Sequence, residues 1–269
     1  MYMDIYQIQK SIGRGSYGQV YKVIHKDTKG EYAMKKVNLA TLSQYEKSNL
    51  INELRILSTH QCPFIVKFKT AFVEQSYLYF VTEFAFKGDL THVFKDHKHR
   101  NEPIGEATVW TYFLQICIAL SYLHNLNIIH RDLKPANVFI DRDDNIKLGD
   151  FGISKIMRKF MMFGQTQIGT PLYMSPEIFK RERYDVKVDI WALGCVLYEM
   201  MSLDPAFKAA NIVELKNNIF RGIIPGVRTE YSSQLKAMLK TLICIYPRQR
   251  PSIRSILNTD FVRSQLKIR

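Results

Sequence analysis

The first third of the chain alternates hydrophobic and polar residues in short runs that glycine or charged residues interrupt. Because successive side chains on a β-strand point to opposite faces, this alternation predicts strands with one buried face. We predict an antiparallel sheet with strands at Tyr6–Ile12, Gly18–His25, Tyr32–Val37, Val66–Phe72 and Leu78–Glu83. Ser43–Ser58 differs, since Leu50, Leu54 and Leu57 recur at helical spacing and predict one helix within this sheet region.

After residues 87–89 the spacing of apolar residues becomes that of helices. Glu106–Asn125 carries its apolar residues on one stripe, whereas Val186–Met201 is apolar nearly all round and is predicted to be a buried central helix. Further helices are predicted at Asn211–Arg221, Ser232–Ile245 and Ser252–Leu257, and two short strands at Val138–Ile140 and Ile146–Leu148. The predicted fold class is therefore α+β, with a small β-rich lobe followed by a larger helical lobe.

Composition and charge narrow the classes of function. With 46% hydrophobic and 12% aromatic residues, the chain can form a substantial core, in one large domain or two small lobes. The net charge of +13 could attract nucleic acid, an acidic membrane or an acidic protein, but the basic residues are spread along the chain without a nucleic-acid-binding motif. We expect neither nucleic-acid nor membrane binding. The densest basic cluster, Lys95–Arg100, is interpreted as a solvated loop, and His92, His97 and His99 lack the further ligands of a zinc site.

Cysteine usage and apolar runs bear on the compartment. Cys62, Cys117, Cys195 and Cys244 form no CxxC pair, so we predict buried free thiols in a reducing compartment. The N-terminus lacks the apolar segment of a signal peptide, and the most apolar stretch, Ile190–Tyr198, is too short to cross a bilayer. A soluble intracellular protein is expected.

Three glycines, Gly13, Gly15 and Gly18, lie in the turn between the first two predicted strands. Glycine lets the backbone approach phosphate groups closely, because no Cβ intervenes. A dinucleotide-binding fold would need a helix after this GxGxxG motif, whereas here a strand follows, which favours a kinase-type phosphate loop. Lys35, on the third predicted strand, could neutralise phosphate charge, with Glu53 on the predicted helix as its partner and Glu46 as the structural alternative.

The segment HRDLKPAN, residues 130–137, is far more specific. Asp132 is predicted to accept the proton of a substrate hydroxyl, Lys134 to contact the γ-phosphate, and Asn137 to bind a magnesium ion. Thirteen residues beyond Asn137 comes the DFG motif, in which Asp150 would hold magnesium against the β- and γ-phosphates. Lysine at position 134 is typical of kinases that phosphorylate serine and threonine.

The chain from about Tyr6 to Val262 resembles a eukaryotic protein kinase. The segments LGDFGI (148–153), IGTPLYMSPE (168–177) and DIWALGCVLYE (189–199) resemble those of the NIMA-related kinases. The resemblance implies a bilobal kinase domain over residues 1–269, with an N-lobe at 1–82, a hinge at 83–87, a C-lobe at 88–269 and an activation segment at 150–177. It also implies ATP and Mg²⁺ as cofactors, with Mn²⁺ as a substitute, and a monomeric kinase domain.

The resemblance further assigns nucleotide-binding residues. Val20 and Ala33 would cover the adenine on one side and Phe139 on the other; Glu83 and Ala85 would offer it a backbone carbonyl and amide from the hinge. Thr82 would occupy the gatekeeper position beside the base. The phosphate loop and its supporting pair would comprise Ile12, Gly13, Arg14, Gly15, Ser16, Tyr17 and Gly18, with Lys35 and Glu53.

Regulatory and structural roles are implied in the same way. Arg131 and Lys155 would bind a phosphate on Thr166, although Thr166 could also be an ordinary exposed loop residue. Glu177 would pair with Arg250, and Asp189 would hold the backbone of the HRDLKPAN loop.

Two positions bear on activity and on the choice of acceptor. Several NIMA-related kinases carry tyrosine where this chain has Phe68, and that hydroxyl can hold an inactive state. The β-branched Ile153 would favour threonine over serine as the acceptor.

The main rival is a pseudokinase scaffold that binds ATP or partners without catalysis. Such proteins usually lack one of the chemical groups, whereas this chain retains all six: Lys35, Glu53, Asp132, Lys134, Asn137 and Asp150. A small-molecule kinase is disfavoured by the complete activation segment. Protein substrates with serine or threonine acceptors are therefore expected, and family analogy suggests a cytoplasmic protein with roles at the cytoskeleton, centrosome or cilium.

Overall fold

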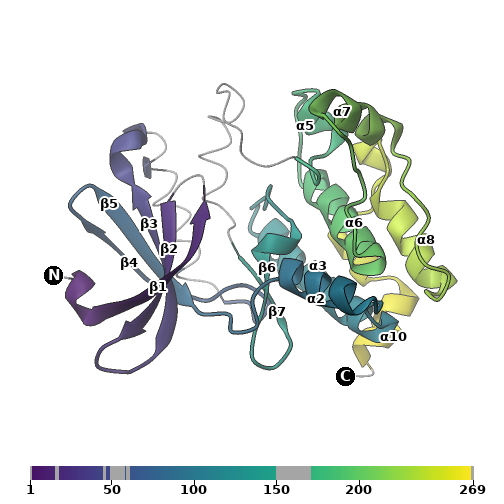
Figure 1. The fold of residues 1–269 in the computed structure, drawn as a ribbon. Helices are drawn as coiled ribbons and strands as arrows, with labels where there is room; N and C mark the ends of the chain where they lie inside the picture. The colour runs from purple at the N-terminus through teal and green to yellow at the C-terminus, as the bar shows by residue number, and fades with distance from the viewer. Residues whose placement is uncertain are drawn as a thin grey trace. The chain divides into compact units, whose positions relative to one another are not determined.

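The computed structural model describes residues 2–15, 18–44, 47–48, 58, 61–149 and 171–267. These residues divide into two compact units, one running up to Phe86 (unit 1) and the other starting at Lys87 (unit 2) (Figure 1). The α+β class predicted from the sequence is confirmed, since the strands of the large sheet all lie in unit 1 and the long helices in unit 2.

Unit 1 is built on a five-stranded antiparallel sheet with the strand order β1-β2-β3-β5-β4. The strands are β1 (Tyr6–Gly15), β2 (Gly18–His25), β3 (Glu31–Asn38), β4 (Phe68–Glu74) and β5 (Tyr77–Glu83), with 3₁₀ turns η1 (Tyr2–Ile5) and η2 (Leu39–Thr41). All five predicted strands are confirmed. The first extends to Gly15 because its pairing with β2 continues to the Gly15–Gly18 pair. The predicted helix at Ser43–Ser58 lies largely outside the described residues.

Strand β5 explains how the sheet of unit 1 is stabilised. Leu78 and Phe80 pack with Val37 in one apolar cluster, whereas Tyr79 and Val81 pack in another on the opposite face. Alternate residues of one strand therefore enter two cores, as expected for a strand buried on both faces.

Unit 2 is mainly helical (Figure 1). Its elements are α2 (Leu90–Arg100), α3 (Glu106–Asn125), α5 (Pro176–Phe179), α6 (Lys187–Ser202), α7 (Ile212–Arg221), α8 (Ser233–Leu242), α9 (Ile253–Leu257), α10 (Asp260–Lys267), the 3₁₀ turns η3 (Pro135–Asn137) and η4 (Pro247–Gln249), and the short antiparallel strands β6 (Val138–Ile140) and β7 (Ile146–Leu148).

Helix α6 forms the centre of unit 2, as its all-round hydrophobicity predicted. Every residue from Val188 to Met201 is buried. Gly194 allows the end of α8 to approach closely, because a Cβ at this position would lie 2.7 Å from the Cγ1 of Ile243. Side chains that α6 presents to its surroundings are therefore held firmly in place.

Two predictions need correction. Lys95–Arg100 is not a loop but the C-terminal half of α2. The helix begins at an Asp89 cap that accepts a hydrogen bond from the His92 amide, buries Leu90 and Phe94, and gains from basic residues in its last turn. The four cysteines are free, but only Cys117 and Cys195 are buried; Cys62 and Cys244 are partly exposed.

Two kinds of feature are absent from the described residues. No helix there is both long and apolar enough to cross a membrane. Within the same residues, no group of three or more His, Cys, Asp or Glu side chains could hold a metal ion.

Candidate active site

The HRDLKPAN loop (residues 130–137) is attached to the centre of unit 2 by Asp189 of α6. The Asp189 carboxylate, only 1% exposed, accepts hydrogen bonds from the backbone amides of His130 (2.9 Å) and Arg131 (2.8 Å). A third bond joins it to Nε2 of His124 on α3 (2.9 Å). A buried carboxylate needs such donors, and here they fix the start of the loop.

Arg131 adopts a left-handed backbone conformation, with φ of 67°. This conformation is unfavourable for a non-glycine residue and persists only where surrounding contacts enforce it. The hydrogen bonds that the His130 and Arg131 amides donate to Asp189 supply that enforcement. His130, fully buried, adds to it: its Nδ1 accepts from the Asp132 amide (3.2 Å), so that its Nε2 donates to the Gly149 carbonyl (3.1 Å).

The Asp132 carboxylate is oriented by two donors. Its Oδ2 accepts hydrogen bonds from Lys134 Nζ and from Asn137 Nδ2, each at 2.9 Å. Asn137 Nδ2 also donates to the Asp132 carbonyl at 2.7 Å. The three side chains predicted to carry the chemistry of unit 2 thus form one hydrogen-bonded cluster, in which Asp132 can act as a base and Lys134 can supply a positive charge.

Asn137 is suited to metal binding. Both hydrogens of its amide are directed to Asp132, so its Oδ1 is the atom that could ligate a cation. The backbone carbonyl of Asn137 accepts a hydrogen bond from the Gly149 amide (2.9 Å). Gly149 immediately precedes Asp150 in the chain. Amide and carboxylate oxygens are the ligands that Mg²⁺ prefers, so this set of donor atoms fits the predicted ion.

In unit 1, the predicted nucleotide-binding side chains share one face of the sheet. Residues directly opposite one another in an antiparallel pair point to the same face. The register pairs Lys35 with both Val20 and Phe80, and pairs Ala33 with Thr82. The sheet therefore brings Val20, Ala33, Lys35 and Thr82 together.

Other residues of unit 1 border this face. Phe68 of β4 is also opposite Thr82, and the Lys35 ammonium lies 6.0 Å from the centre of the Phe80 ring. The start of the predicted hinge is fixed by Glu83, whose amide donates to the Lys67 carbonyl at 2.9 Å. Ala85, the other predicted hinge contact, is partly buried, and Ile12 is 40% exposed.

Two positions of the predicted phosphate loop, Gly13 and Gly18, are suited to glycine for different structural reasons. A Cβ on Gly18 would lie 1.8 Å from the Lys36 carbonyl, so the pairing of β2 with β3 itself requires glycine there. At Gly13, a Cβ would meet only the Val20 side chain, at 3.8 Å. The packing of unit 1 thus leaves Gly13 room for a side chain, and its lack of one suits the close approach of a phosphate.

Phe139, predicted to contact the base from the other lobe, lies in β6 of unit 2, where it pairs with Asp89 and with Lys147 of β7. Several predicted residues lie outside the described residues, namely Ser16, Tyr17, Glu46, Glu53, Asp150, Ile153, Lys155 and Thr166. Of Arg14 and Gly15 the structure describes only the backbone, as the last two residues of β1.

Glu177 and Arg250 form a buried, two-pronged ion pair. The two nitrogens of the guanidinium head donate to the two carboxylate oxygens, at 2.6 and 2.9 Å. Arg250 also donates to the carbonyls of Cys244 (2.7 Å) and Lys187 (2.9 Å). The pair therefore joins α5 to the N-terminus of α6 and to the segment before η4.

Some contacts at this site were not predicted. One is the bond from His124 to Asp189 described above. Another is the hydrogen bond that the Tyr173 hydroxyl donates to Glu199 of α6 at 2.7 Å. Burial raises the pKa of Glu199. The Arg131 guanidinium faces the Tyr184 ring at 5.7 Å, and its buried Nε has no hydrogen-bond partner among the described residues. That unsatisfied donor fits the anion-binding role predicted for Arg131.

Comparison with known proteins gives the family. A family model described as the protein kinase domain matches residues 6–262. The chain is similar to the probable serine/threonine-protein kinase nek3 of Dictyostelium discoideum, with 38% identity over 99% of this chain and 24% of that protein. It is also similar to the mouse serine/threonine-protein kinases Nek4 (38% identity, covering 98% and 33%) and Nek1 (37% identity, covering 98% and 22%). The chain thus spans about a quarter to a third of the length of these relatives.

Proposed function

Because the chain belongs to the protein kinase family, we propose that it transfers the γ-phosphoryl group of ATP to serine or threonine hydroxyls of protein substrates. The observation that carries the proposal is the hydrogen-bonded cluster of Asp132, Lys134 and Asn137. Similarity to proteins named serine/threonine-protein kinases supports the acceptor class.

Each side chain of the cluster has a distinct task. Asp132 orients the acceptor hydroxyl and takes its proton, since its carboxylate is held by two donors. Lys134 offsets the negative charge of the transferring phosphoryl group. Asn137 Oδ1 and the carboxylate of Asp150 are the groups that would hold Mg²⁺, or Mn²⁺ in its place. When bound, that ion neutralises the phosphate oxygens.

Finer features belong to the same proposal. The hinge at 83–87, a phosphate on Thr166 held by Arg131 and Lys155, and a threonine preference set by Ile153 follow from the resemblance to NIMA-related kinases. So do a monomeric kinase domain and a cytoplasmic location at the cytoskeleton, centrosome or cilium. A peptide pair that differs only in serine or threonine at the acceptor tests the preference, and a clear preference for serine would contradict it.

Transfer of labelled phosphate from ATP to casein, with and without magnesium, tests the central proposal. We expect Asp132→Asn to lower the rate by at least about 100-fold, because the variant keeps the shape of the side chain but loses the base. Asp96→Asn, on the exposed part of α2, is the matched control and should retain the wild-type rate. Nucleotide binding by the wild type without any transfer would instead identify a pseudokinase.

A further inference from the structure

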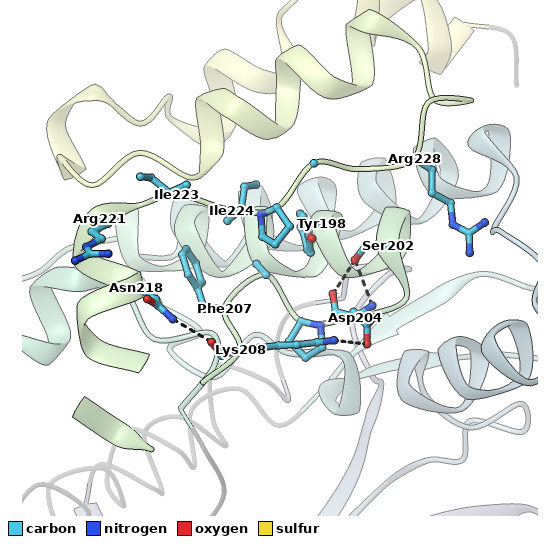
Figure 2. Close-up of a pocket in the computed structure, with 14 residues that line it drawn as sticks. Tyr198, Ser202, Asp204, Phe207, Lys208, Asn218, Arg221, Ile223, Ile224 and Arg228 are labelled. Carbon is cyan, nitrogen blue, oxygen red and sulfur yellow. Dashed lines mark hydrogen bonds and ion pairs between the residues drawn. The ribbon is translucent and has the colours of Figure 1, made fainter. Parts of the chain in front are cut away.

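Unit 2 contains a pocket with a volume of about 660 Å³ that involves no residue of the HRDLKPAN loop. It lies where the C-terminal end of α6 meets the loop before α7, the last turn of α7 and the segment that follows it (Figure 2). The function proposed above assigns no role to this pocket.

The inner wall of the pocket is apolar and closely packed. Tyr198, Ala206 and Phe207 line it and are each less than 5% exposed, and Ile224 contributes a further apolar wall. The Phe207 ring stacks on Trp191 of α6, with 5.4 Å between ring centres and 6° between planes. These packed side chains form an apolar floor, and the more accessible apolar lining belongs to Ile223 and Ile224.

The rim of the pocket is basic. Three of its lining residues are cationic, Lys208, Arg221 and Arg228, and one is acidic, Asp204. The charge of Asp204 is already balanced by Lys98 (2.7 Å) and Lys208 (2.9 Å). The two arginines therefore give the pocket an excess of positive charge.

These arginines are available to a ligand. Arg221 is exposed and has no ion-pair partner among the described residues, and Arg228 has only a contact with Glu230 at 3.8 Å. Figure 2 shows Arg221 and Arg228 at opposite ends of the pocket, with apolar side chains between them. A ligand that matches this arrangement carries an apolar group between two negative charges.

The apolar surface of the pocket reaches its rim at Ile223. Ile223, beside Arg221, is 74% exposed. Single exposed aliphatic residues are ordinary, but Ile223 lines the pocket itself and extends its apolar surface to the rim. With Arg221 and Arg228 at its two ends, the apolar surface suits an extended segment of polypeptide.

We propose that this pocket binds an acidic segment of a protein substrate, whose aliphatic side chain packs against Ile223 and Ile224 while flanking carboxylates pair with Arg221 and Arg228. The proposal rests on the kinase function above, because it makes the pocket a docking site that holds a substrate away from its acceptor residue. The net charge of +13 would speed the encounter with such an acidic partner.

A binding assay tests the pocket without catalysis. The probe is a fluorescein-labelled synthetic peptide with one leucine flanked by glutamates, and fluorescence anisotropy measures its affinity. Arg221→Glu and Arg228→Glu should each weaken binding by about tenfold, through loss of one ion pair and repulsion of the probe. Lys240→Glu, exposed on α8 and outside the pocket, makes the same change in net charge and should leave the affinity nearly unchanged.

Peptide controls separate the two parts of the proposed ligand. Replacing the leucine by serine, or the glutamates by lysines, should each abolish measurable binding. Equal weakening by Arg221→Glu and Lys240→Glu would overturn the proposal, as would binding only of a phosphorylated peptide. So would sedimentation showing that Arg221 instead mediates association of two copies of this chain.

A kinetic assay connects the pocket to the reaction. Two substrates share the same acceptor sequence, and only one carries the acidic segment at a distance from it. Arg221→Glu should raise KM for the longer substrate by about tenfold, with kcat unchanged and the short substrate unaffected. If the wild type phosphorylates neither substrate, the kinase function fails, whereas the anisotropy result still decides whether the pocket binds the peptide.

Discussion

Removing the charge of Glu177 should destabilise unit 2 strongly. In Glu177→Gln, the Arg250 guanidinium stays buried, with no exposed side-chain surface, but loses the carboxylate that balances it. A neutral amide of the same size cannot supply the missing charge. The substitution therefore isolates the charge from the volume of the side chain.

The magnitude follows from the burial of the pair and from the remaining contacts of Arg250. Breaking a buried ion pair by removing one partner typically costs about 3–5 kcal/mol. Arg250 keeps the carbonyls of Cys244 and Lys187 and its stacking on Trp191, at 5.1 Å. We therefore expect the lower end, a loss of about 3 kcal/mol, which corresponds to a melting temperature about 5 °C lower for a chain of this length.

Tryptophan fluorescence during urea unfolding measures this loss directly. Both tryptophans of the chain, Trp110 and Trp191, are buried in unit 2, so the signal reports the unit that contains the pair. The matched control is Asp144→Asn, which removes an equally close but exposed ion pair with Lys87 (2.7 Å) and should cost less than about 1 kcal/mol. If Glu177→Gln costs no more than this control, burial does not make the pair important and the reasoning is wrong.

Three further predictions concern the loop, the pH dependence and the basal activity. Asp189→Asn leaves one carbonyl oxygen for the three donors that the carboxylate now serves. The variant should lower kcat with casein by at least about tenfold, and urea unfolding should show unit 2 destabilised by about 1–3 kcal/mol. Burial raises the pKa of Glu106, but hydrogen bonds from Ser232 and Trp110 outweigh it and hold the pKa below its ordinary value of 4.5. The stabilisation from the ionised Glu106 is present above pH 4.5 and is lost as pH falls through the folded-state pKa. Glu106→Gln should therefore have a lower free energy of unfolding than wild type at pH 7. In urea unfolding measured at successively lower pH, the difference between the two proteins should shrink. Phe68→Tyr should lower basal kinase activity, and an unchanged or higher rate would count against a restraining tyrosine hydroxyl.

The strands and long helices could be predicted from sequence because their hydrophobic patterns are local. Strand β2 and helix α3 have the predicted bounds, and α6 differs from the prediction by one residue at each end. Helix α2 was obscured by the charges at residues 95–100, since only Leu90 and Phe94 mark its buried face. A pattern with two buried positions in three turns carries little periodic signal.

The candidate site divides in the same way. Asp132, Lys134 and Asn137 are close in sequence, so a fixed spacing was enough to group them. His124 and Asp189 are joined across 65 positions, and Tyr173 and Glu199 across 26. Such contacts depend on how α6 packs against α3 and against the segment before α5, and nothing local in the sequence marks them. The pocket is of this kind too, because its walls come from two runs of the chain, 198–208 and 218–228.

Helix α6 explains why these separate features are held in one arrangement. Its first turn carries Asp189, which fixes the HRDLKPAN loop, and its last turns carry Tyr198 and Ser202, which line the pocket. Between them, Trp191 contacts the Arg250 guanidinium and also stacks on Phe207 of the pocket. A change in the packing of Trp191 would therefore disturb both the ion pair and the apolar interior of the pocket. Changes at the exposed Arg221 leave this core intact, which is why they can separate substrate docking from the stability of the unit and from the chemistry at Asp132.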